Sequence, residues 1–349
     1  DPNAWHNQFY SLVTTKIDEE IFKPLFPEGK KSGRPNASIR ILVAMSVLKE
    51  GFGCSDEDLF EKCEFDLLTR KALGMELLTD VTPSIDTYYL FRRRICEYQE
   101  RTGIDLMQLC FEQLAGKHVH LLKISGKCVR MDSKLIGSNI ARQSRYELIH
   151  TTLVKFLKTC TLTHLSPEQE ERAKEYLKED SSKTVYRSDS DTLQSNLARI
   201  GNFIMEMLAV FPATSPAHDL LLRLFEEQYV VMDGKAVLRD KKEVKADSLQ
   251  NPNDPDATYR AKNDQKVQGY VTNITETVEE GKPNIITSVQ VETAVFADCH
   301  FLQEAVENSE RVTDSTIEDL YADGAYQSPD NREFAKNHNA MQLKTGKMQ

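Results

Sequence analysis

Two aspartates, Asp132 and Asp323, each follow a short segment that the sequence predicts to be a strand. The first segment is Lys127 to Met131, and the second is Thr316 to Ala322. α/β sheets place their chemistry at the carboxyl ends of parallel strands. Two carboxylates there can share divalent cations that act on a phosphodiester, and Mg²⁺ prefers such oxygen ligands. Spacing alone is a weak signal, because an aspartate at a strand end also serves to cap a turn.

The chain before these strands is predicted to be helical. Helix-type spacing, N-caps and glycine stops indicate helices that begin near Ser38, Ser55, Leu67, Ser84 and Asp105, the last running to Ala115. The connections are short, as in a compact helical bundle. We therefore expect an all-α N-terminal domain over residues 1–120.

The remainder, residues 121–349, is predicted to be an α/β domain interrupted after its first strand. His118 to Ile124 is expected to be extended, and a helical insertion is expected at about 142–250. A Pro/Asp/Asn-rich loop is expected over 247–264. Beyond it the pattern predicts, in order, a hairpin (265–278 and 284–294), a helix (298–308), the strand before Asp323, a helix (328–337) and a strand (340–344).

Composition narrows the class of protein. The 349 residues include 40% hydrophobic ones, enough for a sizeable core. No apolar run reaches the length of a membrane span, so a cytoplasmic protein is expected. The seven scattered cysteines indicate free thiols. The net charge of −10 argues against a nucleic-acid partner unless basic residues are local, and acids and bases nearly cancel up to Arg145.

Several segments resemble bacterial insertion-sequence transposases of the DDE type. Four of them lie in the α/β part: VRMDSKLIGSNIAR, NPNDPDATYRAKNDQKVQGYVTNI, TAVFADCHFL and LYADGAYQSPDN. The N-terminal stretches GRPNASIRILVAMSVLKEGFGCSDEDLFEKCEFDLLTRKALGM and TPSIDTYYLFRRRI resemble the helical domain at the front of those enzymes. The resemblance covers nearly the whole chain in the expected order. It implies an RNase H-like mixed sheet, with the strands before Asp132 and Asp323 side by side.

The same resemblance implies an Asp, Asp, Glu triad that holds Mg²⁺ (or Mn²⁺). Asp132 matches the first aspartate and Asp323 the second. The glutamate belongs beyond the last strand, and the later carboxylates Asp330 and Glu333 fall on the intervening helix. We therefore expect a C-terminally truncated form that is one carboxylate short, so its catalytic competence is open.

Basic residues indicate where DNA would bind. Arg92, Arg93 and Arg94 lie on one predicted helix, and Lys30, Lys31 and Arg34 form a second basic group. Each set fits phosphate contacts, and each equally fits a solvated surface. Asp254 and Asp256 either orient metal or DNA near the site or shape the loop that enters the second strand. Arg260 and Lys262 either contact phosphate or belong to a solvated loop. His118 and His120 alternate on one predicted strand, where ordinary histidines are the better interpretation than a metal pair.

The function that the sequence favours is a DNA transposase, expected to be nucleoid-associated. It would cleave transposon ends and transfer strands by metal-dependent phosphoryl transfer. Its partners would be double-stranded DNA (terminal inverted repeats and target DNA) and a second copy in an active homodimer, with no membrane partner. Two alternatives stay open: an inactive DNA-binding transposase remnant, and an RNase H-like nuclease without strand transfer.

Overall fold

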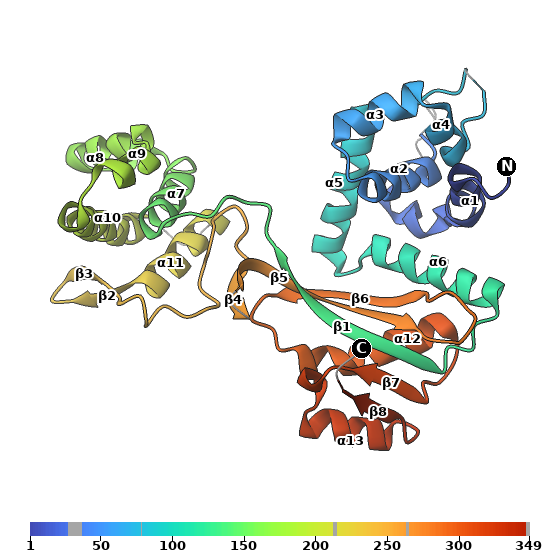
Figure 1. Ribbon diagram of the computed structural model, residues 1–349. Helices are drawn as coiled ribbons and strands as arrows, with labels where there is room; N and C mark the ends of the chain where they lie inside the picture. Colours follow the sequence, from blue (N-terminus) through green and yellow to red (C-terminus); the bar gives the residue numbers. More distant parts are fainter. Residues whose placement is uncertain (27–36, 78, 212–214, 263–264, 347–349) are drawn as a thin grey trace. The chain divides into compact units, whose positions relative to one another are not determined.

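The computed structural model describes residues 1–26, 37–77, 79–211, 215–262 and 265–346 (Figure 1). Its backbone forms two compact units. The first unit comprises Asp1–Met131, Ile274–Val289 and Leu302–Gln349, and the second comprises Asp132–Asn273 and Gln290–Phe301. Helices and a mixed sheet together make the protein α/β, as expected.

The N-terminal helices of the first unit form largely where the sequence predicts them. They are α1 (Trp5–Leu12), α2 (Ile39–Phe52), α3 (Asp56–Phe65), α4 (Leu67–Leu73), α5 (Ile85–Thr102) and α6 (Leu106–Leu122), with the 3₁₀ turns η1 (Thr14–Lys16) and η2 (Glu19–Leu25). Ser55 and Ser84 cap α3 and α5 through their side chains. Gly53, Gly74 and Gly103 end three of the helices with positive φ angles, which cost a glycine no Cβ clash. Local capping signals therefore set these boundaries.

The prediction of an extended segment at His118–Ile124 is wrong, because α6 continues to Leu122. Ala115 and Val119 are both buried, four residues apart on one helical face. A short apolar run without Gly or Pro fits a helix as well as a strand. Packing of Ala115 and Val119 on one face favours the helix over the strand.

The mixed sheet has the strand order β4-β5-β1-β7-β8, and β6 pairs with β5. Its strands are β1 (Cys128–Gly137), β4 (Thr258–Lys262), β5 (Gln265–Thr277), β6 (Ile286–Thr293), β7 (Asp319–Ala322) and β8 (Gln342–Thr345). Between them come η4 (Asp298–Phe301), α12 (Leu302–Thr313), η5 (Gly324–Tyr326) and α13 (Pro329–Asn337). The predicted β5–β6 hairpin and the parallel neighbours β1 and β7 are confirmed.

Two strand predictions need correction. β1 does not end before Asp132 but runs on to Gly137, and the next residue, Ser138, donates its backbone N–H to Gln268 O on β5 at 2.8 Å. The stretch 247–264, predicted to be loop, contains β4, which pairs antiparallel with β5 from Thr258↔Gly269 to Lys262↔Gln265. Pairing with β5 overrides the polar, turn-prone composition of both segments.

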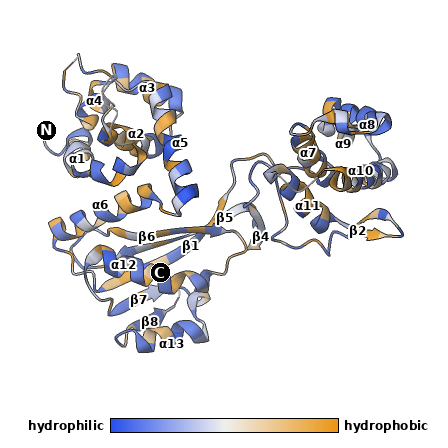
Figure 2. Cartoon of the chain, turned by 180° about the vertical axis from the view of Figure 1, so that it is seen from behind, coloured by the Kyte–Doolittle hydropathy of each residue, from blue (hydrophilic) through white to orange (hydrophobic). Residues whose placement is uncertain are grey.

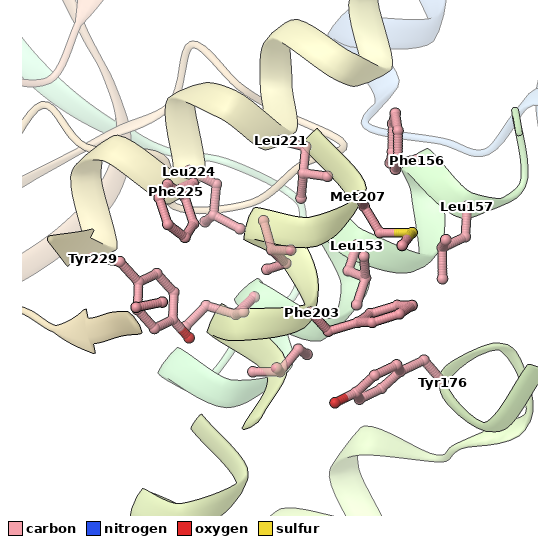
Figure 3. Packing of buried hydrophobic residues seen from close by; sticks show 14 of the residues in the cluster. Leu153, Phe156, Leu157, Tyr176, Phe203, Met207, Leu221, Leu224, Phe225 and Tyr229 are labelled. Carbon is pink, nitrogen blue, oxygen red and sulfur yellow. The ribbon is translucent and has the colours of Figure 1, made fainter. Parts of the chain in front are cut away.

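The helical insertion belongs to the second unit. It contains α7 (Arg145–Leu157), η3 (Leu162–His164), α8 (Pro167–Lys178), α9 (Ser181–Arg187), α10 (Ser190–Val210) and α11 (Pro216–Gln228). The helix α9 and the hairpin of β2 (Tyr229–Met232) and β3 (Lys235–Leu238) were not predicted. Figure 3 shows how side chains such as Leu153, Phe203 and Tyr229 pack together between these helices. The insertion thus has its own hydrophobic core.

Figure 2 colours the chain by the hydropathy of each residue. The helix α8 is coloured largely hydrophilic, which agrees with the fact that Ala173 and Tyr176 are the only two of its described residues that are buried. Within the described ranges, no helix is long and apolar enough to cross a membrane.

Candidate functional site

The parallel pairing of β1 with β7 defines the region of interest. Its register, within the first unit, is Cys128↔Asp319, Val129↔Leu320 and Arg130↔Tyr321. Asp132 follows Arg130 by two residues, and Asp323 follows Tyr321 by two residues. The two aspartates therefore occupy equivalent positions beyond the last of these pairs.

Asp132 lies within β1, at the first residue of the second unit. Its side chain is exposed, while the preceding Met131 is buried. Its Oδ1 accepts a hydrogen bond from the backbone N–H of Ser133 at 2.9 Å. The alternation of β1 thus turns this carboxylate away from the core and towards solvent.

Asp323 directly follows the last residue of β7 and belongs to the first unit. Its side chain is half-buried and caps η5, with Oδ1 accepting from Ala325 N at 2.7 Å. The turn-capping role is therefore real, and it engages one of the two carboxylate oxygens. Asp330 and Glu333 lie on α13, between β7 and β8, as the sequence predicts.

Asp254 holds its loop to the flanking strands in the second unit. Its Oδ1 accepts from the Tyr270 hydroxyl, and its Oδ2 accepts from Ser138 Oγ. Burial and the bond to this carboxylate raise the pKa of Tyr270. Both oxygens are occupied within the protein, so the loop-shaping interpretation fits Asp254 best. Asp256 is exposed.

Gly269 allows a close approach of β5 to β1 beside this loop. A Cβ built on it would lie 2.2 Å from Ile136 O and 2.6 Å from Ser138 N. Both are backbone atoms, which cannot rotate away as a side chain can. Gly269 O in turn accepts from Ala294 N. Only a residue without a side chain fits here.

The guanidinium group of Arg260 is held by hydrogen bonds within the protein, so it is not available to bind phosphate. Its Nη1 donates to Ala294 O, Phe296 O and the buried Asp298 carboxylate at 3.0–3.3 Å. The side chain of Lys262 lies outside the described residues. On the neighbouring stretch of β1, Lys134 is exposed, and it lines a shallow hollow together with Arg260 and Gln265.

The three consecutive arginines of α5, Arg92 to Arg94, differ in their surroundings. Arg92 pairs with Asp56 at 3.9 Å and lies over the Tyr88 ring, and Arg94 lies over the Phe26 ring. Arg93 is exposed, and no ion pair involves it within the described part of the chain. The second basic group, Lys30, Lys31 and Arg34, lies outside the described residues.

The two histidines of the segment predicted to be a strand lie on a helix. His118 and His120 lie on α6, and His118 Nε2 is 2.8 Å from Leu12 O. Among the described residues, no group of three or more His, Cys, Asp or Glu side chains is arranged to hold a metal ion.

The structure also shows a row of polar side chains that sequence reasoning missed. On the exposed face of the sheet in the first unit, Glu276 (β5), Arg130 (β1), Tyr321 (β7) and Lys344 (β8) follow one another across the strands. We call these four residues the cross-strand row. Arg130 pairs with Glu276, and Lys344 pairs with Asp319 at 2.7 Å, which raises the pKa of Lys344. Alternation within each strand was the available signal, but the pairing of the strands was not visible in the sequence.

Comparison with known proteins agrees with the N-terminal part of this picture. Residues 3–94 match the model of a family described as "Transposase domain (DUF772)". This range spans α1 to α4 and the first half of α5, including Arg92 to Arg94. No curated protein and no solved structure matches the chain. The match supports a transposase, an enzyme that acts on DNA.

Proposed function

We propose that the protein is a DDE-type insertion-sequence transposase whose RNase H-like domain acts on DNA by metal-dependent phosphoryl transfer. The observation that carries this proposal is the β1–β7 register. Asp132 on β1 and Asp323 directly after β7 each lie two residues beyond the pair Arg130↔Tyr321 of these parallel neighbouring strands. Such a pair of carboxylates is what a divalent-cation site for phosphodiester chemistry requires.

The residues fit Mg²⁺ or Mn²⁺. Each aspartate has one oxygen, Oδ1, engaged by a backbone N–H, from Ser133 and Ala325 respectively. Mg²⁺ keeps several waters and needs only one or two carboxylates besides substrate phosphate oxygens. When bound, the cations would activate a water or a 3′-hydroxyl and stabilise the leaving oxygen. The two aspartates would hold these cations, and the positive charge of the cations would keep the scissile phosphate in place.

The proposed substrates are the terminal inverted repeats of the element and a target duplex, acted on by a homodimer associated with the nucleoid. The transposase-domain match at residues 3–94 supports a DNA partner for the N-terminal helices. Of the three consecutive arginines, exposed Arg93 is the best placed to contact phosphate, because Arg92 and Arg94 already have partners. The net charge of −10 makes such local contacts necessary.

The proposed reaction is tested with labelled DNA that carries the genomic flanks of the coding sequence. In Mg²⁺ or Mn²⁺, we expect nicks at the element ends, followed by joining of the new 3′ ends to a target plasmid. With EDTA, binding should persist and cleavage should stop. Cleavage without joining would favour the nuclease alternative. Binding without cleavage under any metal condition would favour the DNA-binding remnant and contradict the proposal.

Replacing Arg93 by Ala should reduce the dependence of DNA binding on salt. One lost phosphate contact should lower the slope of log K against log salt concentration by about 1. Fluorescence anisotropy of labelled DNA across a salt series measures this slope. Arg93→Lys keeps the charge and serves as the matched control, with a wild-type slope. A wild-type slope for Arg93→Ala as well would assign Arg93 to a solvated surface.

A further inference from the structure

We propose that Tyr321 is a stacking platform for a DNA base next to the cleaved phosphate, with Arg130 and Lys344 held beside the ring. This inference rests on the proposed function and deepens it, because it names a substrate-binding residue of the same site. The observation behind it is the position of Tyr321 in the cross-strand row. It is a large aromatic side chain left 38% exposed on a strand with neighbours on both sides.

The face of β7 on which Tyr321 lies also carries Asp323. Leu320 and Ala322 are buried, whereas Tyr321 is exposed and Asp323 is half-buried, so the alternation of the strand continues through the aspartate. Asp323 keeps extended backbone angles, with φ −78° and ψ 174°. At about 3.3 Å per residue, Tyr321 and Asp323 are about 6.6 Å apart along the strand. That is roughly two base steps of 3.4 Å in a DNA strand.

The surroundings of the ring suit a nucleic acid. Lys344 Nζ lies 5.0 Å from the ring centroid and 3.4 Å from the hydroxyl, and Arg130 is the register partner of Tyr321 on β1. Aromatic rings stack on any base, whatever the DNA sequence. The carboxylates of Glu276 and Asp319 pair with the two cations and fix them in position. Both cations are therefore balanced by carboxylates, and stacking on Tyr321 is the sequence-tolerant contribution of the row.

The test uses DNA that carries 2-aminopurine one or two nucleotides from the cleaved phosphate, bound in Ca²⁺ to prevent reaction. Stacking on Tyr321 should quench the probe. Tyr321→Leu keeps an apolar strand residue without the ring, so it should restore the fluorescence and weaken binding by about 5-fold or more. The salt slope of binding should not change, because stacking releases no counterions. Tyr321→Phe should behave as the wild type.

Two controls separate the possible outcomes. Tyr186→Leu removes an exposed aromatic of α9 outside the site and should leave quenching unchanged. If Tyr321→Leu unfolds on heating at the same temperature as the wild type, the strand is intact. Tyr321→Trp keeps an aromatic side chain that is favoured in sheets, so it should retain quenching. If Tyr321→Leu quenches and binds like the wild type while Asp132→Asn blocks cleavage, the platform is wrong and the proposed function stands. If Asp132→Asn still cleaves, the proposed function itself fails.

Discussion

Replacing Asp132 by Asn is expected to abolish DNA cleavage and to leave DNA binding in place. The amide oxygen can still accept the hydrogen bond from Ser133 N, and the side chain is exposed, so the fold should not change. What the substitution removes is a negative charge able to hold a divalent cation. A bound cation supplies several kcal/mol to phosphoryl transfer, so the cleavage rate should fall by about 10³-fold or more. Gel assays of cleavage in Mg²⁺ and of binding in Ca²⁺ measure the two effects.

The matched control is Asp330→Asn, which removes an exposed carboxylate on α13. It should cleave DNA at the wild-type rate. Equal loss in both variants would indicate a general effect of charge on DNA binding. Full activity of Asp132→Asn would exclude the aspartate as a metal ligand.

Replacing Gly269 by Ala is expected to destabilise the second unit by about 2 to 3 kcal/mol. The added Cβ would lie 2.2 Å from Ile136 O, and the backbone of β1 must move to admit it. That movement would strain the hydrogen bond from Ser138 N to Gln268 O and the loop bonds of Asp254. Urea unfolding followed by circular dichroism measures the change.

Gly137→Ala is the control for this prediction. Gly137 ends β1 on the adjacent strand, and a Cβ there has no atom within 4 Å among the described residues. Its stability should stay within about 0.5 kcal/mol of the wild type. Equal stability of the two variants would show that β5 can shift away from β1 without cost.

The parts of the fold that the sequence predicted well depend on local signals. Ser55, Ser84 and the three stop glycines set helix boundaries through bonds within a few residues. The errors arose where distant pairing decides. α6 continues through His118 because Val119 is buried on its inner face. β4 is a strand, despite a sequence typical of loops, because it forms hydrogen bonds with β5. No window of sequence contains that information.

In the candidate site too, local sequence signals predicted some residues, whereas contacts between distant residues could not be predicted. The sequence predicts Asp132 and Asp323 from the short segments before them and from the family resemblance, and the structure pairs β1 with β7. Their role as metal ligands stays a prediction. The bonds of Asp254 and Arg260 and the cross-strand row were beyond sequence reasoning, because each brings together residues more than 15 positions apart. Lys30, Lys31 and Arg34, predicted to contact DNA, lie outside the described residues.

The bond between Ser138 and Asp254 has a consequence for how this protein can vary. Ser138 is where the chain leaves β1, and Asp254 is where it returns towards β4. A second bond, from Asn251 Nδ2 to Ala141 O at 3.2 Å, joins the same two stretches. The insertion therefore enters and leaves the sheet at one point. A change in the length of the insertion between these two joined stretches should therefore leave the ladder of β1 and β5 unaltered.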